Sequence, residues 1–113
     1  MAEAEAESAA LIWCPFPDRD TARSVITALL DARLVACANI IGEVESHFLW
    51  QGAQDRATET GVLFKTTAAR LDAAVAHLGK LHPYDTPAIV GWAADAALPE
   101  TIAWLASVTQ PVR

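Results

Sequence analysis

Two cysteines and one histidine are the side chains of this sequence with the clearest capacity for chemistry. Cys14 closes a short apolar stretch, Cys37 lies in "VACANI", and His82 opens the proline-rich connector "HPYDTP". A thiolate and an imidazole form a soft-to-borderline ligand set, which suits Cu(I), Cu(II) or Zn(II) rather than Mg(II) or Ca(II). The sequence contains neither CxxC nor HxxxH, so a metal site requires the fold to bring these residues together.

The same residues allow two other interpretations. A Cys14–His82 pair has the residue types of a thiolate nucleophile and its base. The sequence has no phosphate-binding loop, no GxSxG and no locally supported Ser/His/Asp arrangement, so we expect no enzymatic activity. The plain structural alternative makes the connector a rigid helix-to-strand turn and each cysteine a small buried apolar side chain.

The composition limits the class of protein. The chain has 113 residues, is 53% hydrophobic and carries a net charge of −6, which indicates one domain with a core and excludes a typical nucleic-acid binder. The charge also argues against attachment to anionic membranes, and no apolar run is long enough to span one. The start, "MAEAEAESAA", is acidic where an export signal is basic. We therefore expect a flexible acidic tail over residues 1–8, a domain over residues 9–113, and a cytoplasmic location.

The first half of the sequence predicts a strand, a helix and a long strand. "LIWC" is typical of a first strand that is buried on both faces. Asp18 is placed to cap a helix that ends near Ala32. Val44, Phe48 and Trp50 then lie on one side of a period-two pattern, which predicts a half-exposed strand.

The second half completes an α+β fold. "QGAQD" predicts a turn, "TETGVLFKT" a returning strand, Thr67 the cap of a second helix, "AIVGWAA" a fourth strand, and Pro99 the start of a last helix. The order β-α-β-β-α-β plus a C-terminal helix is the ferredoxin-like sandwich, with strand order 4-1-3-2. This topology places Cys14 beside the connector that starts at His82, and Cys37 at the opposite edge of the sheet.

The long second strand predicts an oligomer. As one strand, residues 34–50 would span on the order of 55 Å, whereas a compact domain of this size has a radius of gyration of about 13 Å. The resulting β-hairpin would overhang the body and expose backbone and aromatic side chains. We expect another subunit to cover it. The alternative is a bend at Gly42 that folds the excess back.

Four motifs in order resemble one family. "DARLVACANI", "WQG" followed by Glu59 and "LFKT", "LHPYDTPAI" and "IAWL" are similar to the CutA family of divalent-cation tolerance proteins, from Leu11 to about Gln110. The resemblance implies a ferredoxin-like protomer and a homotrimer held by strands that extend between subunits. It also implies tolerance of copper and other divalent cations, with a signalling or homeostatic role.

The resemblance also implies positions for the functional residues. The family's copper-site positions fall on Cys14 and His82, with Cys37 as a second cysteine candidate. The ion would be copper, as Cu2+ or Cu+, or zinc, and would not be required for folding. The family-typical positions near subunit contacts are Trp50, Gly52, Glu59, Lys65 and Tyr84. The sequence departs at Leu81 and Ala88, where relatives often carry a histidine or a glutamate.

Two further functions remain open. Trp50, Glu59, Lys65 and Tyr84 would line a cleft between subunits in a trimeric small-molecule sensor, an argument from fold analogy. Without such a ligand, Glu59 and Lys65 would form an ion pair across the interface. The other possibility is a trimeric scaffold that recruits another protein and has no physiological metal.

Overall fold

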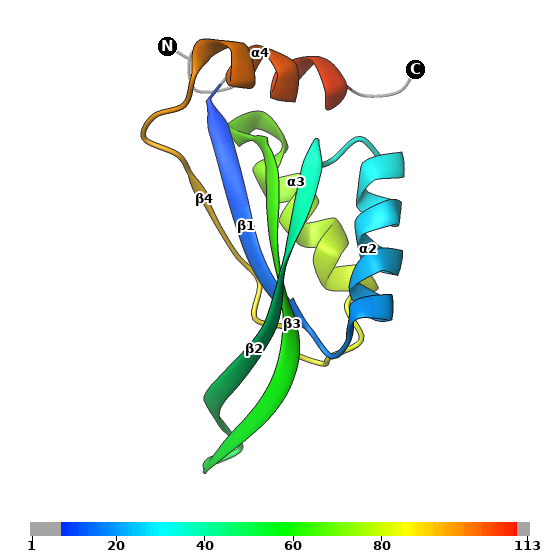
Figure 1. The fold of residues 1–113 in the computed structure, drawn as a ribbon, viewed down its shortest axis with the longest axis vertical. Helices are drawn as coiled ribbons and strands as arrows, with labels where there is room; N and C mark the ends of the chain where they lie inside the picture. The colour runs from blue at the N-terminus through cyan, green and yellow to red at the C-terminus, as the bar shows by residue number, and fades with distance from the viewer. Residues whose placement is uncertain (1–7, 111–113) are drawn as a thin grey trace.

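The computed structural model describes residues 8–110 as an antiparallel four-stranded sheet with helices on one face and across one end (Figure 1). The elements are β1 Ala9–Phe16, α2 Arg19–Asp31, β2 Cys37–Trp50, β3 Ala53–Thr67, α3 Ala68–Leu81, β4 Val90–Ala93 and α4 Pro99–Val108. The strand order β2-β3-β1-β4 is the predicted 4-1-3-2 order counted from the other edge. None of the helices in this part of the chain is long and apolar enough to cross a membrane.

The predicted acidic tail falls largely outside the described residues. Its last member, Ser8, is described, and its carbonyl oxygen accepts a hydrogen bond of 2.8 Å from the Ala68 N–H. This bond ties the start of β1 to the start of α3.

Burial in the sheet is one-sided. The fully buried apolar residues of β1 and β3 are Ala10, Ile12, Cys14, Phe16, Val62 and Phe64. The alternate residues Leu11 and Trp13 are only partly buried, so the prediction that both faces of the first strand are buried is wrong. The reason is that α2 and α3 cover a single face of the sheet. On the open face the Trp13 ring lies against Gly61, where any Cβ would collide with it.

Helix α2 is capped by a side chain at its start and by backbone hydrogen bonds at its end. The Asp18 carboxylate accepts a 2.7 Å hydrogen bond from the Thr21 N–H, which confirms the predicted cap and lowers the pKa of Asp18. At the other end, Arg33 takes a left-handed conformation with φ 60°. The Leu34 N–H bonds the Leu29 carbonyl, as in a Schellman motif, and the chain turns toward β2.

The long hairpin has a tight turn and one bulge. Gln51 and Gly52 both have positive φ, at 50° and 80°, which is the two-residue loop that matches strand twist. The predicted turn "QGAQD" was therefore too long, because residues 53–55 already pair with β2. The bulge lies where Ile41 has no partner in β3. The next residue, Gly42, has φ 129°, a conformation open essentially to glycine alone.

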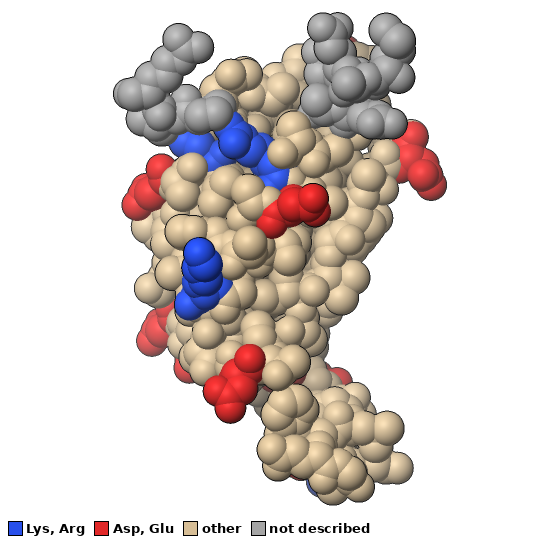
Figure 2. Space-filling model, turned by 180° about the vertical axis from the view of Figure 1, so that it is seen from behind, with Lys and Arg blue, Asp and Glu red and all other residues tan. Residues whose placement is uncertain are grey.

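The hairpin extends beyond the body of the protein. The described chain measures 44 × 27 × 22 Å, and Figure 1 shows β2 and β3 continuing well past both covering helices. The bulge therefore does not fold the excess back. In Figure 2 the hairpin, at the lower right, is mostly uncharged surface, while charged side chains are scattered over the body. Its large apolar side chains are exposed: Ile41, Phe48, Leu49 and Trp50.

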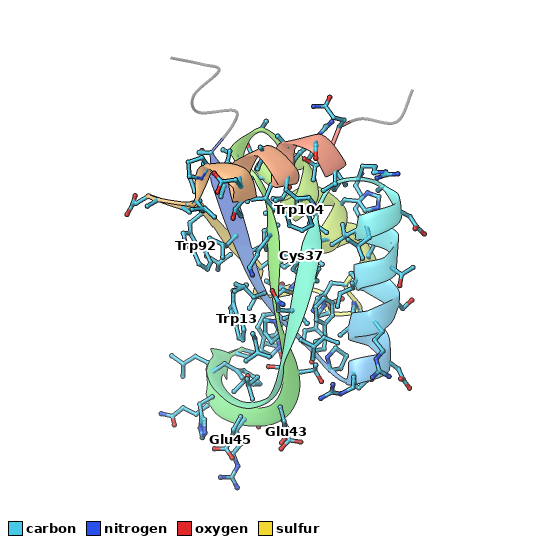
Figure 3. All side chains as sticks on the ribbon, turned by 45° about the horizontal axis from the view of Figure 1, so that its top comes forward. Trp13, Cys37, Glu43, Glu45, Trp92 and Trp104 are labelled. Carbon is cyan, nitrogen blue, oxygen red and sulfur yellow. The ribbon has the colours of Figure 1, made fainter. Side chains whose placement is uncertain are left out.

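A second exposed apolar area lies on the sheet itself. Trp92 of β4 is 45% exposed, and Figure 3 shows it with Trp13 on the side of the sheet away from α2. The described part of the chain thus leaves a sheet face and an overhanging ribbon uncovered. Soluble monomers rarely expose such areas together.

Candidate functional site

Cys14 and His82 meet at one backbone oxygen. The Cys14 Sγ donates to the Pro15 carbonyl oxygen at 3.6 Å, and the His82 Nε2 lies 2.8 Å from the same oxygen. The structure therefore brings the end of β1 and the connector after α3 together, as the topology predicted. Both donor atoms carry a proton in this arrangement, since a carbonyl oxygen can only accept.

The His82 ring is held on every side. Its Nδ1 accepts a 3.2 Å hydrogen bond from the Tyr84 N–H, and the ring stacks on Phe16 with centroids 4.8 Å apart. Only 6% of the residue is exposed. With Nε2 donating and Nδ1 accepting, the imidazole is neutral and both nitrogens are used, so a metal ion would have to displace a hydrogen bond to reach either one.

Glu59 joins this group from β3. It is 7% exposed, and the Tyr84 hydroxyl donates a 2.9 Å hydrogen bond to its Oε2. No lysine, arginine or histidine among residues 8–110 pairs with it. In the same part of the chain no fully buried polar side-chain atom lacks a partner, so Glu59 Oε1, for which no bond is seen, reaches the surface.

The carboxylate sets the electrostatics of its neighbours. Burial raises the pKa of the Cys14 thiol to about 12, and the charge of Glu59 adds to the effect. Burial likewise raises the pKa of Tyr84 to about 12, followed by the hydrogen bond and charge of Glu59 and the charge of Asp18. The potential around Glu59 is therefore negative, and no cationic side chain of the described residues forms an ion pair that would neutralise it.

We call Cys14, Pro15, Glu59, His82 and Tyr84 the Glu59 corner. The sequence assigned Cys14 and His82 to a metal site and the other two titratable residues to a cleft between subunits, but one chain brings all four together. Within the described residues no group of three or more His, Cys, Asp and Glu side chains is arranged to hold a metal ion. The corner thus consists of a carboxylate, a thiol and a neutral imidazole, and one carboxylate oxygen has no hydrogen-bond partner.

The remaining candidates lie elsewhere. Cys37 is half-buried and pairs in register with Lys65 across β2 and β3. Lys65 is six residues from Glu59 along β3, or roughly 20 Å, so the two do not meet within one chain. Trp50 lies at the tip of the hairpin, opposite Ala53.

Comparisons with known proteins identify the family of the chain. A family model described as CutA1 divalent ion tolerance protein matches residues 10–108. The chain belongs to this family.

Individual CutA relatives match over most of their length. The divalent-cation tolerance protein CutA of Thermotoga maritima is 36% identical over 95 residues, which cover 84% of this chain and 93% of that protein. The protein of the same name from Pyrococcus horikoshii is 32% identical over 88% of this chain and 97% of its own.

Solved CutA structures share the fold. The Xylella fastidiosa CutA structure superposes with a TM-score of 0.86, at 30% identity over 91% of this chain and 99% of that chain. A second, from Archaeoglobus fulgidus, is described as a periplasmic divalent cation tolerance protein; its TM-score is 0.85 at 26% identity over 90% of this chain and 99% of its own. The predicted ferredoxin-like α+β architecture is therefore confirmed.

Sequence reasoning missed Pro15, which is a member of the Glu59 corner in this CutA-family chain, and Phe16, which packs against the corner. Pro15 contributes its carbonyl oxygen and Phe16 the ring on which His82 stacks. The signal was present in "CPF", since a proline has no N–H and offers only its carbonyl oxygen, as an acceptor, to a side-chain donor. Which donor would reach it depends on the connector's path, which the sequence pattern does not specify.

Tyr84 offers a direct check of the corner, because it is the only tyrosine in the chain. Burial, together with the hydrogen bond and charge of Glu59, raises the pKa of Tyr84 to about 12. Glu59→Gln removes that charge, so the pKa should fall toward the ordinary value near 10. An alkaline titration of tyrosinate ultraviolet absorbance measures this. Glu43→Gln, on the exposed part of β2, is the control, and an unchanged titration in Glu59→Gln would contradict the Glu59–Tyr84 contact.

Proposed function

We propose that this CutA-family protein acts in divalent-cation tolerance as a homotrimer, and that it binds its cation at the Glu59 corner. The ion is copper or zinc, because these are the ions that carboxylate, thiol and imidazole groups together would select once binding releases their protons and hydrogen bonds. Binding of this ion reports or buffers the cation level, so the role is one of signalling or homeostasis. No catalytic step is part of the proposal.

One observation carries the proposal: the nearly buried carboxylate of Glu59 has one oxygen without a hydrogen-bond partner, and no cationic side chain among residues 8–110 pairs with it. A buried charge without a partner is costly, and proteins ordinarily pair it or use it to coordinate a metal. Two neighbouring acids, Cys14 and Tyr84, have pKa values raised in part by Glu59. A cation beside Oε1 would stabilise the Glu59 carboxylate and would lower the raised pKa values of both neighbours.

The Cys14–His82 pair alone does not fit a metal as it stands. The Cys14 side chain is fully buried, its raised pKa keeps the thiol protonated at neutral pH, and both nitrogens of His82 are hydrogen-bonded. A thiolate is the form that binds metal. Glu59 is therefore the primary ligand in this proposal, and the thiol and imidazole lie behind it.

The trimer is supported by what one chain leaves uncovered. The overhanging hairpin exposes Phe48 and Trp50 on one face, and the outer edge of β2 has no neighbouring strand among the described residues. Lys65 lies roughly 20 Å from its own Glu59, so any Glu59–Lys65 contact requires a second copy. If Lys65 of a second copy supplies the missing positive charge, the corner needs no metal ion. That arrangement would favour the function of a small-molecule sensor.

The testing experiment is native mass spectrometry of protein purified without added metal, followed by addition of Cu2+ or Zn2+ at neutral pH. We expect the mass of three chains and up to one ion per chain at the Glu59 corner. Glu59→Gln should weaken that binding by at least about tenfold, since even changing a hydrogen-bonding partner of a metal ligand commonly costs that much.

Matched variants separate the alternatives. Glu43→Gln removes an exposed carboxylate from β2 and should leave binding at the corner unchanged. Equal metal binding in Glu59→Gln and wild type would overturn the cation site. Retention of an organic ligand that Lys65→Met releases, with no metal bound, would favour the sensor instead.

A further inference from the structure

An exposed histidine–carboxylate pair lies on the hairpin, apart from the Glu59 corner. The Nε2 of His47 and the Oε2 of Glu45 are 2.7 Å apart, and the side chains are 62% and 68% exposed. Residues two apart on a strand point to the same face. Glu59 pairs with Val44, so this pair lies on the opposite face of the ribbon from the corner.

The two atoms are already spaced for a shared ion. Cu2+ and Zn2+ bind imidazole nitrogen and carboxylate oxygen at about 2.0–2.2 Å, which separates neighbouring ligand atoms by about 3 Å. The pair needs to open by only a few tenths of an ångström. We propose that Glu45 and His47 bind one borderline divalent cation, of the Cu2+ or Zn2+ class, in place of the proton that they now share.

The surroundings define how such a site would behave. The described residues contain no third His, Cys, Asp or Glu close enough to complete a cluster, so water fills the other coordination positions. Glu43, two residues away on the same face, adds negative charge, and Figure 3 shows it with Glu45 at the hairpin, pointing away from the body. Arg56 pairs with His47 across the ladder, and its positive charge opposes the ion.

This site differs from the proposed corner in access. An ion reaches Glu45 and His47 without displacing a core hydrogen bond, whereas Cys14 and His82 lie in the interior. Exposed pairs of this kind add little to folding stability. Substitutions at the hairpin pair can therefore test binding without unfolding the protein.

The test uses Cu2+ alone as the probe, with paramagnetic broadening of backbone NMR signals to locate it. In the wild-type protein we expect broadening centred on Glu45–His47 and the facing residues 56–58. His47→Gln should weaken this binding at least about tenfold, because it removes one of only two protein ligands. His77→Gln, a histidine substitution on α3, is the control and should bind as wild type does.

A second variant predicts a gain. Arg56→Gln removes the opposing charge and should tighten Cu2+ binding at the hairpin by severalfold. Glu59→Gln, which tests the proposed function, should leave the hairpin signal intact, so failure of one site does not imply failure of the other. Three results would overturn the hairpin site. The first is wild-type affinity in both His47→Gln and Glu45→Gln, and the second is broadening centred on other residues. The third is an unchanged affinity in Arg56→Gln.

Discussion

Replacing Cys14 by alanine should reduce the decrease in the free energy of unfolding that the protein shows as pH rises from about 9 to about 12. In the unfolded chain the thiol ionises near its ordinary pKa of 9.0, whereas burial and the charge of Glu59 raise that pKa to about 12 in the fold. Between these values the unfolded chain releases a proton that the folded chain retains. The stabilising contribution of Cys14 is thus fully present below pH 9 and is lost as pH rises toward 12.

The expected size is large. A difference of about three pKa units corresponds to up to about 4 kcal/mol. The alanine variant should lose about 1–2 kcal/mol at neutral pH through the small cavity that it creates. It should then change less with pH than the wild type. Tyr84 titrates in the same direction, so part of the alkaline loss remains.

Urea unfolding at a fixed protomer concentration, repeated across this pH range, measures the effect. Cys37→Ala is the matched control, because Cys37 is only half-buried, and it should keep the full alkaline loss. A Cys14→Ala variant with the same pH dependence as the wild type would show that the thiol is not held protonated by its surroundings.

Two carboxylates introduced by substitution on one face of the hairpin should separate the proposed trimer into single chains. Phe48 and Trp50 alternate on one face of β2 and are 41% and 46% exposed. Burying an unpaired carboxylate against a neighbour costs several kcal/mol, and every interface of the trimer would contain two of them. The Phe48→Glu/Trp50→Glu variant should therefore sediment as a folded monomer.

Leu49 provides the control for this prediction. It lies between the two aromatic residues, points to the opposite face and is 76% exposed, so Leu49→Glu should leave assembly intact. Sedimentation velocity over a range of concentrations distinguishes the outcomes. A wild-type protein that sediments as a concentration-independent single chain would contradict the trimer, and equal effects of all three substitutions would contradict the assignment of the faces.

Periodicity and capping predicted the fold well, because those signals are local. Asp18 caps α2, Pro99 starts α4, and the strand order follows from the succession of elements. The turn was predicted too long because Ala53, Gln54 and Asp55 have low strand propensity. They form a strand because β2 offers them a paired backbone, which is a tertiary effect.

The site was predicted in pieces rather than as a whole. Topology correctly placed Cys14 beside His82, since both lie at ends of elements that meet at one edge. Glu59 was assigned to a cleft between subunits, yet the structure buries it within one chain, where the Tyr84 hydroxyl donates to it. Alternation describes a strand and its own sheet, and it carries no information about a connector that crosses over it.

The bulge at Gly42 has a consequence for how copies of this chain can join. A contact that joins the hairpin of one copy to a different surface of the next is head-to-tail. Such contacts close into a ring only at the correct rotation, and otherwise continue as an open filament. The bulge bends the hairpin, so it helps to set that rotation. Substitution of Gly42, whose φ of 129° other residues rarely adopt, would therefore be expected to change that rotation and to favour open polymers over closed rings.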